Sequence, residues 1–168
     1  VWQTGSGTQT NMNLNEVLAR RGSELLSSAD KKSKTIHPND HCNLGQSSND
    51  TYPTAMHIAA FIKLRDNFIP AVNSLLNTML SKSSEFSDIV KIGRTHSMDA
   101  TPMTLGQEFH TFGEQIKNNL QRVISASQSL LELPQGGTAV GTGLNTPEGW
   151  DQKIVSELAN LTGIAFSP

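Results

Sequence analysis

The chain has 168 residues, the length of one ordinary domain or of a large part of a bigger protein. Its net charge of −2 gives no basic field for nucleic acid, and no apolar run reaches the roughly 18 residues that span a bilayer. A single cysteine, Cys42, excludes an internal disulfide and fits a reducing compartment. The chain opens without Met and stops at Pro168, so we expect an interior part of a longer protein.

The first third of the chain predicts a loop, a helix and a connector. Gly, Thr, Gln and Ser dominate residues 1–10, a composition typical of a loop. Asn13 or Asn15 can cap a helix that runs through Leu25, which Gly22 should weaken. Residues 27–35 are polar and predict a solvated connector.

Two long amphipathic helices are predicted next. Asp50 should cap the first, with Pro53 in its first turn, and its apolar stripe continues to Leu80. Pro70 should kink this helix or divide it. The second carries a seam with alternating spacings of four and three, on which Asn119 and Ala126 fill two positions and the others are apolar: Leu105, Phe109, Phe112, Ile116, Val123, Leu130 and Leu133. Stripes this long need partner helices to cover them.

The remaining chain predicts a glycine-rich loop over 136–143 and a last helix over 147–163. No Gly-Lys-Ser/Thr follows the glycines, so this loop predicts a structural turn rather than a phosphate cradle. No substantial strand pattern occurs. The sequence therefore predicts an all-α, mainly helical fold.

Four polar blocks are candidates for chemistry. Gly93-Arg94-Thr95-His96 combines donors with an imidazole, the side chain that best transfers protons near neutral pH; a surface histidine is the alternative. Ser47, Ser48 and Asn49 precede a predicted helix, where an anion is favoured, although plain capping is the favoured interpretation of this block taken alone. Ser6-Gly7-Thr8 offers a similar turn, or a surface loop.

The fourth block is His37-Pro38-Asn39-Asp40, followed by His41. We place the side chains of His37 and His41 outside helical spacing, and a second Cys or His pair is lacking, which argues against a metal. A loop that presents His37 and Asn39 to an anion is the favoured interpretation.

Taken together, these blocks resemble class II fumarases of the fumarase/aspartase superfamily. The matching stretches are WQTGSGTQTNMNLNEV (2–17), HPND (37–40), QSSNDTYPTAMHIAA (46–60), KIGRTHSMDATPMTLGQEF (91–109) and GGTAVGTGLNTP (136–147). The resemblance implies the fumarase/aspartase-like fold, with residues 1–45 ending the N-terminal domain and 46–168 opening the central helical bundle. It also implies a homotetramer whose active sites are shared between subunits.

The implied reaction is the reversible anti addition of water to fumarate, giving L-malate in the tricarboxylic acid cycle, with no iron–sulfur cluster, metal or organic cofactor. His96 would act as acid or base on the water. The residues implied to bind the substrate are Ser6, Gly7, Thr8, Ser47, Ser48, Asn49 and Thr95. A second dicarboxylate site is implied at His37, Pro38, Asn39 and Asp40. The bacterial cytoplasm is the favoured location, and the mitochondrial matrix is the alternative.

Two other functions remain open. Aspartate ammonia-lyases share the scaffold but typically carry Gln where this chain has His96, Ala-Gly-Thr at Ser6–Thr8, and Ser-Thr-Asn at Ser47–Asn49. A non-catalytic helical assembly module is the other alternative, because the family's Gly-Ser-Ser-x-Met-Pro-x-Lys-x-Asn-Pro loop does not occur in these residues. That loop supplies the proposed C3 base, so we expect the 168-residue chain alone to be inactive. The family's Asn-Lys-Ser before the serine block is replaced by Asn43-Leu44-Gly45.

Overall fold

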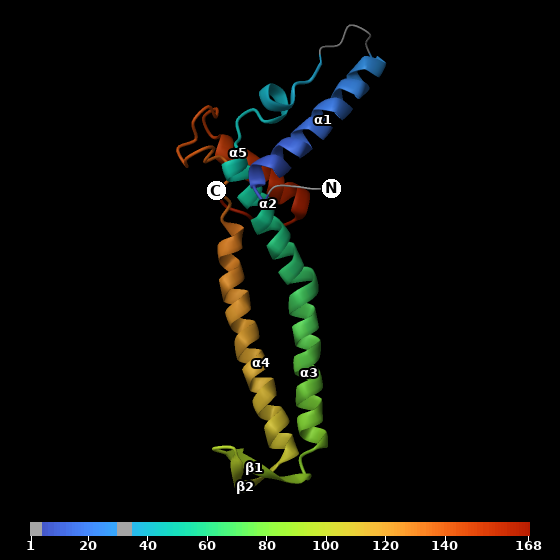
Figure 1. Cartoon of the computed structure of the whole chain (residues 1–168), viewed down its shortest axis with the longest axis vertical. Helices are drawn as coiled ribbons and strands as arrows, with labels where there is room; N and C mark the ends of the chain where they lie inside the picture. The colour runs from blue at the N-terminus through green and yellow to red at the C-terminus, as the bar shows by residue number, and fades with distance from the viewer. Residues whose placement is uncertain (1–4, 30–34) are drawn as a thin grey trace. The chain divides into compact units, whose positions relative to one another are not determined.

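The computed structural model describes residues 5–29 and 35–168 and divides into two compact units. The first joins the described residues up to Ala59 with Leu130–Pro168, and the second is Ala60–Ser129. Helices dominate both units, as predicted (Figure 1). No described helix has the length and apolarity needed to cross a bilayer. The elements in chain order are α1 (Gly7–Ala29), the π-helical turn η1 (Pro38–Cys42), α2 (Ser48–Lys63), the π-helical turn η2 (Leu64–Phe68), α3 (Ile69–Glu85), β1 (Val90–Thr95), β2 (Met98–Thr104), α4 (Leu105–Ser127), the 3-10 turn η3 (Gln128–Leu131) and α5 (Trp150–Thr162).

Helix α1 begins at Gly7, so the predicted loop over 1–10 is wrong from that residue onward. A Cβ at Gly7 would lie 2.5 Å from Cδ1 of Tyr52, and only glycine permits this approach to α2. The expected cap at Asn13 or Asn15 is also wrong. Asn11 and Asn15 are buried and both donate to Oδ1 of Asn43 at 3.0 Å, so these amides serve a tertiary contact rather than a cap.

The polar connector predicted at 27–35 lies mostly outside the described residues, because 30–34 are not described and 27–29 end α1. At Ile36 the chain contacts α1 again, because the Ile36 N–H donates to Oγ of Ser23 at 2.9 Å. Gly22 gives the Ile36 side chain room, since a Cβ there would lie 2.6 Å from its Cδ1. The glycine that should weaken the helix therefore has a packing role.

Pro70 divides the predicted long helix, as expected. It occupies the first turn of α3, and the π-helical turn η2 separates that helix from α2. Pro70 has no N–H for the carbonyl of Asp66, which explains why the regular ladder is interrupted there. The predicted position of Pro53 is wrong. It lies inside α2 rather than in the first turn, because the helix already begins at Ser48.

Helices α3 and α4 lie side by side and form most of the second unit (Figure 1). The most buried positions of α4 are seven residues apart: Gly106, Gly113, Leu120 and Ser127. The heptad spacing is therefore right, but three of these four most buried positions carry small residues, and Leu120 is the one large apolar side chain among them. A Cβ at Gly113 would lie 3.1 Å from Leu80, so glycine lets the two helices approach closely. Phe112 of the predicted seam remains 45% exposed.

Strands β1 and β2 form an antiparallel hairpin that the sequence does not predict. Thr95 pairs with Met98, which leaves His96 and Ser97 as the two-residue tip. A register shift occurs between Ile92 and Arg94, at the buried Gly93. Most side chains of both strands are exposed, so the alternation of a half-buried strand is missing. Thr104 and Gln107 then form a capping box that starts α4.

The last predicted helix is confirmed as α5, with bounds a few residues inside the expected range. It lies between two glycines in the left-handed region, Gly149 (φ 70°) and Gly163 (φ 67°). In the described part of the first unit the buried apolar residues are few: Ala19, Leu133, Val155 and Ile164. Buried polar side chains are more numerous there, so hydrogen bonds organise much of this unit's interior.

Candidate functional site

The first turn of α2 carries the predicted Ser47–Asn49 block. Ser47 directly precedes the helix, and its Oγ accepts the N–H of Asn49 at 3.2 Å. The N–H of Ser47 in turn donates to Oδ1 of Asp50 at 2.8 Å. This reciprocal pair satisfies amides that a helix start leaves unpaired. Ser47 therefore caps the helix, and Asp50, the expected cap, closes the turn from the third helical position.

The carboxylate of Asp50 also holds a distant loop. Asp50 is 2% exposed, and its Oδ2 accepts the N–H groups of Gly136 at 3.1 Å and Thr138 at 2.9 Å. Asn49 adds a bond from Nδ2 to the carbonyl of Ala139 at 2.9 Å. The sequence predicts only a structural turn for 136–143, so it misses this connection between the loop and the first turn of α2.

Thr8 reaches the same turn from α1. Its Oγ1 lies 3.0 Å from Oγ of Ser48, within hydrogen-bond distance. Ser6 is exposed and directly precedes α1, while Gly7 is the first residue of the helix. The structure therefore brings the Ser6–Thr8 and Ser47–Asn49 blocks together, with α1 and α2 as their supports.

A cavity of about 620 Å³ opens beside this contact, within the first unit. Its walls include members of three predicted blocks and of the glycine-rich loop: Thr8, Asn39, Asp40, Ser47, Ser48 and Thr138. Hydroxyl and amide groups line it together with the exposed Asp40 carboxylate, apolar side chains such as Leu44, and the N-terminal turn of α2, whose dipole favours negative charge. Chemically, the arrangement suits a small anion held by neutral donors.

The His37 block forms the one-turn π-helix η1 at Pro38–Cys42, preceded by His37. His37 Nδ1 accepts the N–H of Asp40 at 3.2 Å, and the N–H of His37 donates to Nδ1 of His41 at 2.8 Å. The expectation that His37 and His41 lack helical spacing is wrong, since this turn brings them together. In residues 5–29 and 35–168, no three His, Cys, Asp or Glu side chains form a metal-binding group.

His96 occupies the tip of the hairpin in the second unit rather than a loop beside a helix. His96 (φ 54°) and Ser97 (φ 59°) both have left-handed backbones, the pattern of a type I′ turn. Such turns favour Asn-Gly, so a His-Ser tip stores strain, which accumulates at functional sites. Thr95 ends β1, and both Thr95 and His96 are exposed.

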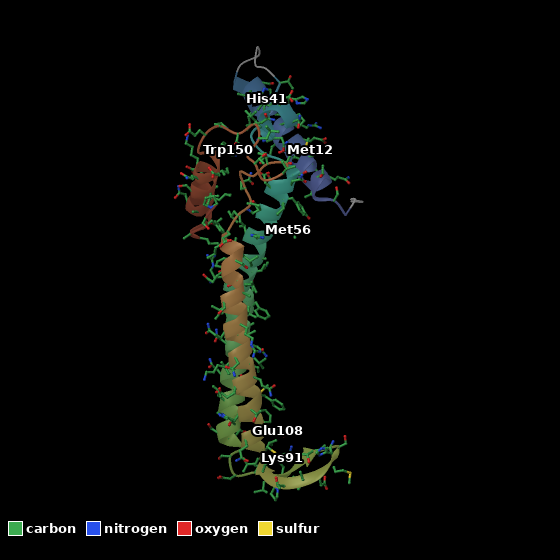
Figure 2. The ribbon with its side chains drawn as sticks, turned by 90° about the vertical axis from the view of Figure 1, so that its left-hand side faces the viewer. Met12, His41, Met56, Lys91, Glu108 and Trp150 are labelled. Atoms are coloured by element: carbon green, nitrogen blue, oxygen red, sulfur yellow. The ribbon has the colours of Figure 1, made fainter. Side chains whose placement is uncertain are left out.

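An ion pair fastens this hairpin to α4. Lys91 Nζ lies 2.6 Å from Oε2 of Glu108, and both side chains are about one-third exposed. Figure 2 shows the two residues where the hairpin meets the helix. Glu108 is therefore a paired residue rather than a freely solvated helix position. The histidines inside α2 and α4 are weaker candidates for proton transfer. His57 contacts the Glu132 carbonyl, and His110 is exposed.

The family model that matches this chain is described as "Lyase", and it matches residues 1–168. The chain belongs to this lyase family. Among its relatives, fumarate hydratase class II of Nitrosomonas europaea is 58% identical over 99% of this chain and 36% of the relative. Fumarate hydratase 1, mitochondrial, of Arabidopsis thaliana is 56% identical over 99% of this chain and 34% of its own length. The resemblance to class II fumarases is thereby confirmed.

Solved structures agree with this family membership. Class II fumarase from Schistosoma mansoni superposes with a TM-score of 0.88 at 47% identity, over 96% of this chain and 34% of that protein. Fumarate lyase:delta crystallin from Brucella melitensis, bound to cobalt, gives 0.86 at 38% identity, over 98% of this chain and 36% of that protein. The fold prediction is confirmed. The chain spans about a third of these relatives, and the boundary at residue 45 and the individual site roles stay predictions.

Proposed function

We propose that the complete protein is a class II fumarate hydratase, which adds water reversibly to fumarate and forms L-malate. The observation that carries the proposal is the convergence of Thr8, Ser47 and Ser48 at one cavity. Relatives that are 50–58% identical to the chain are named fumarate hydratases. Their names support the bacterial cytoplasm or the mitochondrion as the location.

Substrate binding follows from the chemistry of the donors. Fumarate is a flat dianion, and Ser6, Thr8, Ser47, Ser48 and Asn49 offer neutral hydroxyl and amide groups, with Gly7 shaping the same turn. Hydrogen-bond donors fixed around a carboxylate bind it and also stabilise the negative charge that develops on the substrate in the transition state. The positive end of α2 strengthens this preference for an anion.

Proton transfer is assigned to His96, with Thr95 as a further donor to the substrate. In hydration, water attacks one alkene carbon while its proton passes to His96, and a proton is delivered to the other carbon from the opposite face. Dehydration reverses these steps. The family's serine loop, absent from these 168 residues, carries the group that acts at C3. His96 belongs to the second unit and the donors to the first, which is compatible with sites shared among subunits of a homotetramer.

The His37–Asp40 block is proposed as a second dicarboxylate site. His37, Asn39 and Asp40 are exposed and Pro38 is half-buried, and Asn39 and Asp40 also line the cavity described above. Asn39 Nδ2 lies 3.4 Å from Oδ1 of Asp40, so the amide partly offsets the charge of that carboxylate. A dicarboxylate bound here would therefore lie near the donors of the first site.

Offering fumarate and L-aspartate separately to the complete protein tests the assignment. Loss of the fumarate absorbance with formation of L-malate, and no ammonia from aspartate, is the expected result. Ammonia release from aspartate would instead establish the ammonia-lyase. Binding of fumarate without turnover of either compound would establish a non-catalytic assembly module.

A further inference from the structure

Asp50 is the one fully buried charged side chain in the described part of the chain. Three backbone N–H groups bond to its carboxylate, those of Ser47, Gly136 and Thr138, and all are neutral. Burying a carboxylate without a cation is costly, and plain capping would require only the first of these bonds. The remaining two bonds need another explanation.

The loop that Asp50 holds has an unfavourable backbone. Thr138 is β-branched, yet its φ is 57°, a region that such residues rarely enter. Gly136, with φ 105°, is also left-handed. Conformations of this kind persist only where the surroundings impose them. The Asp50 bonds to Gly136 and Thr138, together with the Asn49 bond to Ala139, supply that constraint.

A second connection joins the same two segments. Thr51 Oγ1 donates to Oε1 of Gln46 at 2.8 Å and accepts from Nε2 of Gln135 at 3.3 Å. Gln46 precedes the serine block, and Gln135 precedes the loop that Asp50 holds. Ser47, Ser48 and Thr138 all line the cavity, so these bonds fix two of its walls relative to each other.

We propose that Asp50 is a positioning residue for substrate binding. Its carboxylate ties the Ser47–Asn49 turn to the 136–139 loop and so fixes the distance between the substrate donors and the opposite wall of the cavity. It touches no reacting atom. This proposal rests on the proposed function, and it adds the residue that keeps the binding site in shape.

The test is Asp50→Asn in the complete enzyme, with Thr54→Val as the matched control. Asparagine presents an NH2 group to backbone donors on one side, so one of the two segments loses its acceptor. We expect the KM for fumarate to rise about tenfold while kcat stays within about threefold, the signature of lost uniform binding. Thr54 is equally buried one turn along α2, and its hydroxyl has no partner, so Thr54→Val should leave both constants unchanged.

Hydrogen exchange supplies a readout that is independent of turnover. In Asp50→Asn the amides of Gly136 and Thr138 should lose protection, whereas they keep it in Thr54→Val. Retained protection, or an unchanged KM with only a lower melting temperature, would overturn the proposal. If the unmodified enzyme does not hydrate fumarate, the proposed function fails, and the exchange data alone decide the role of Asp50.

A milder variant covers the case in which Asp50→Asn does not fold. Thr51→Val removes the hydroxyl that lies between Gln46 and Gln135, and 3.3 Å from Oδ1 of Asp50, without removing a buried charge. A rise in KM of about two- to threefold, with kcat unchanged, is expected because this second connection is weaker. An unchanged KM in Thr51→Val would contradict the proposal.

Discussion

Lys91 Nζ and Glu108 Oε2 lie 2.6 Å apart and join the second residue of β1 to the first turn of α4. Two-stranded hairpins are marginally stable by themselves, so their attachment to a helix matters. Because this hairpin carries His96 at its tip, the ion pair helps to fix where the imidazole is held.

Replacing Lys91 by Met and Glu108 by Gln, singly and together, should reveal this coupling. We expect a coupling free energy of about 1 kcal/mol between the two side chains, measured on the free energy of unfolding, because both side chains are half-buried. The coupling should be smaller in high salt. Denaturant unfolding of the complete protein measures it. The matched control is the pair Glu114 and Lys117 on the same helix, which is more exposed and should couple by almost nothing. Equal coupling in both pairs would contradict this account.

The glycines of α4 should differ in their tolerance of a methyl group. A Cβ at Gly106 would clash with the Ser83 carbonyl oxygen, which is backbone and cannot move cheaply. Gly106→Ala should therefore lower the free energy of unfolding by about 1–3 kcal/mol. At Gly113 the neighbour is the flexible end of Leu80, and alanine favours the helix by about 1 kcal/mol, so Gly113→Ala should be nearly neutral. Thermal melts that rank the two variants in the opposite order would refute the close approach at Gly106.

The hairpin tip predicts a stabilising substitution. Ser97 has φ 59°, where a Cβ is unfavourable, so Ser97→Gly should raise the free energy of unfolding by about 0.5–1 kcal/mol. Ser81→Gly is the control, because Ser81 is exposed within α3 and glycine there should lower the free energy by about 0.5 kcal/mol. A loss of stability in Ser97→Gly would argue against the left-handed turn.

Local patterns predict the helices well and the hairpin not at all. Apolar spacing predicts α3 and α4, and Pro70 correctly predicts the division between α2 and α3. The hairpin has two exposed faces and a His-Ser tip without Asn-Gly, so neither strand alternation nor a turn signal is present in the sequence. The start of α1 is missed because Asn15, one of the two expected caps, bonds to Asn43 instead, as does Asn11.

The candidate site is also predictable from the sequence only in part. Ser47, Ser48 and Thr8 are predictable, since short polar residues near a helix start favour an anion. Asp50 is predicted only as a cap, because its bonds to Gly136 and Thr138 join residues more than 80 positions apart. No local pattern encodes such a contact, and it determines which loop lines the cavity.

The 168-residue chain expressed alone should expose apolar surface and lack hydratase activity. Leu14, Val17, Leu18 and Leu25 form an outward stripe of α1, each more than half exposed. Patches of this kind bind hydrophobic dyes and promote aggregation unless they are covered. Dye binding and light scattering, with the complete protein as the reference, measure the effect. A sharp, cooperative melt of a monomeric chain would be inconsistent with this expectation.

Turnover of fumarate by the His96→Asn variant of the complete protein tests the central claim most directly. Asparagine keeps a polar side chain at the hairpin tip but cannot transfer a proton near neutral pH. His110→Asn is the control, because His110 is an exposed histidine of the same unit that has no role in the proposed site. We predict that His96→Asn lowers kcat by about 10²–10⁴-fold while His110→Asn leaves it unchanged. Near-normal turnover in folded His96→Asn would contradict the assignment of His96 and, with it, the proposed mechanism.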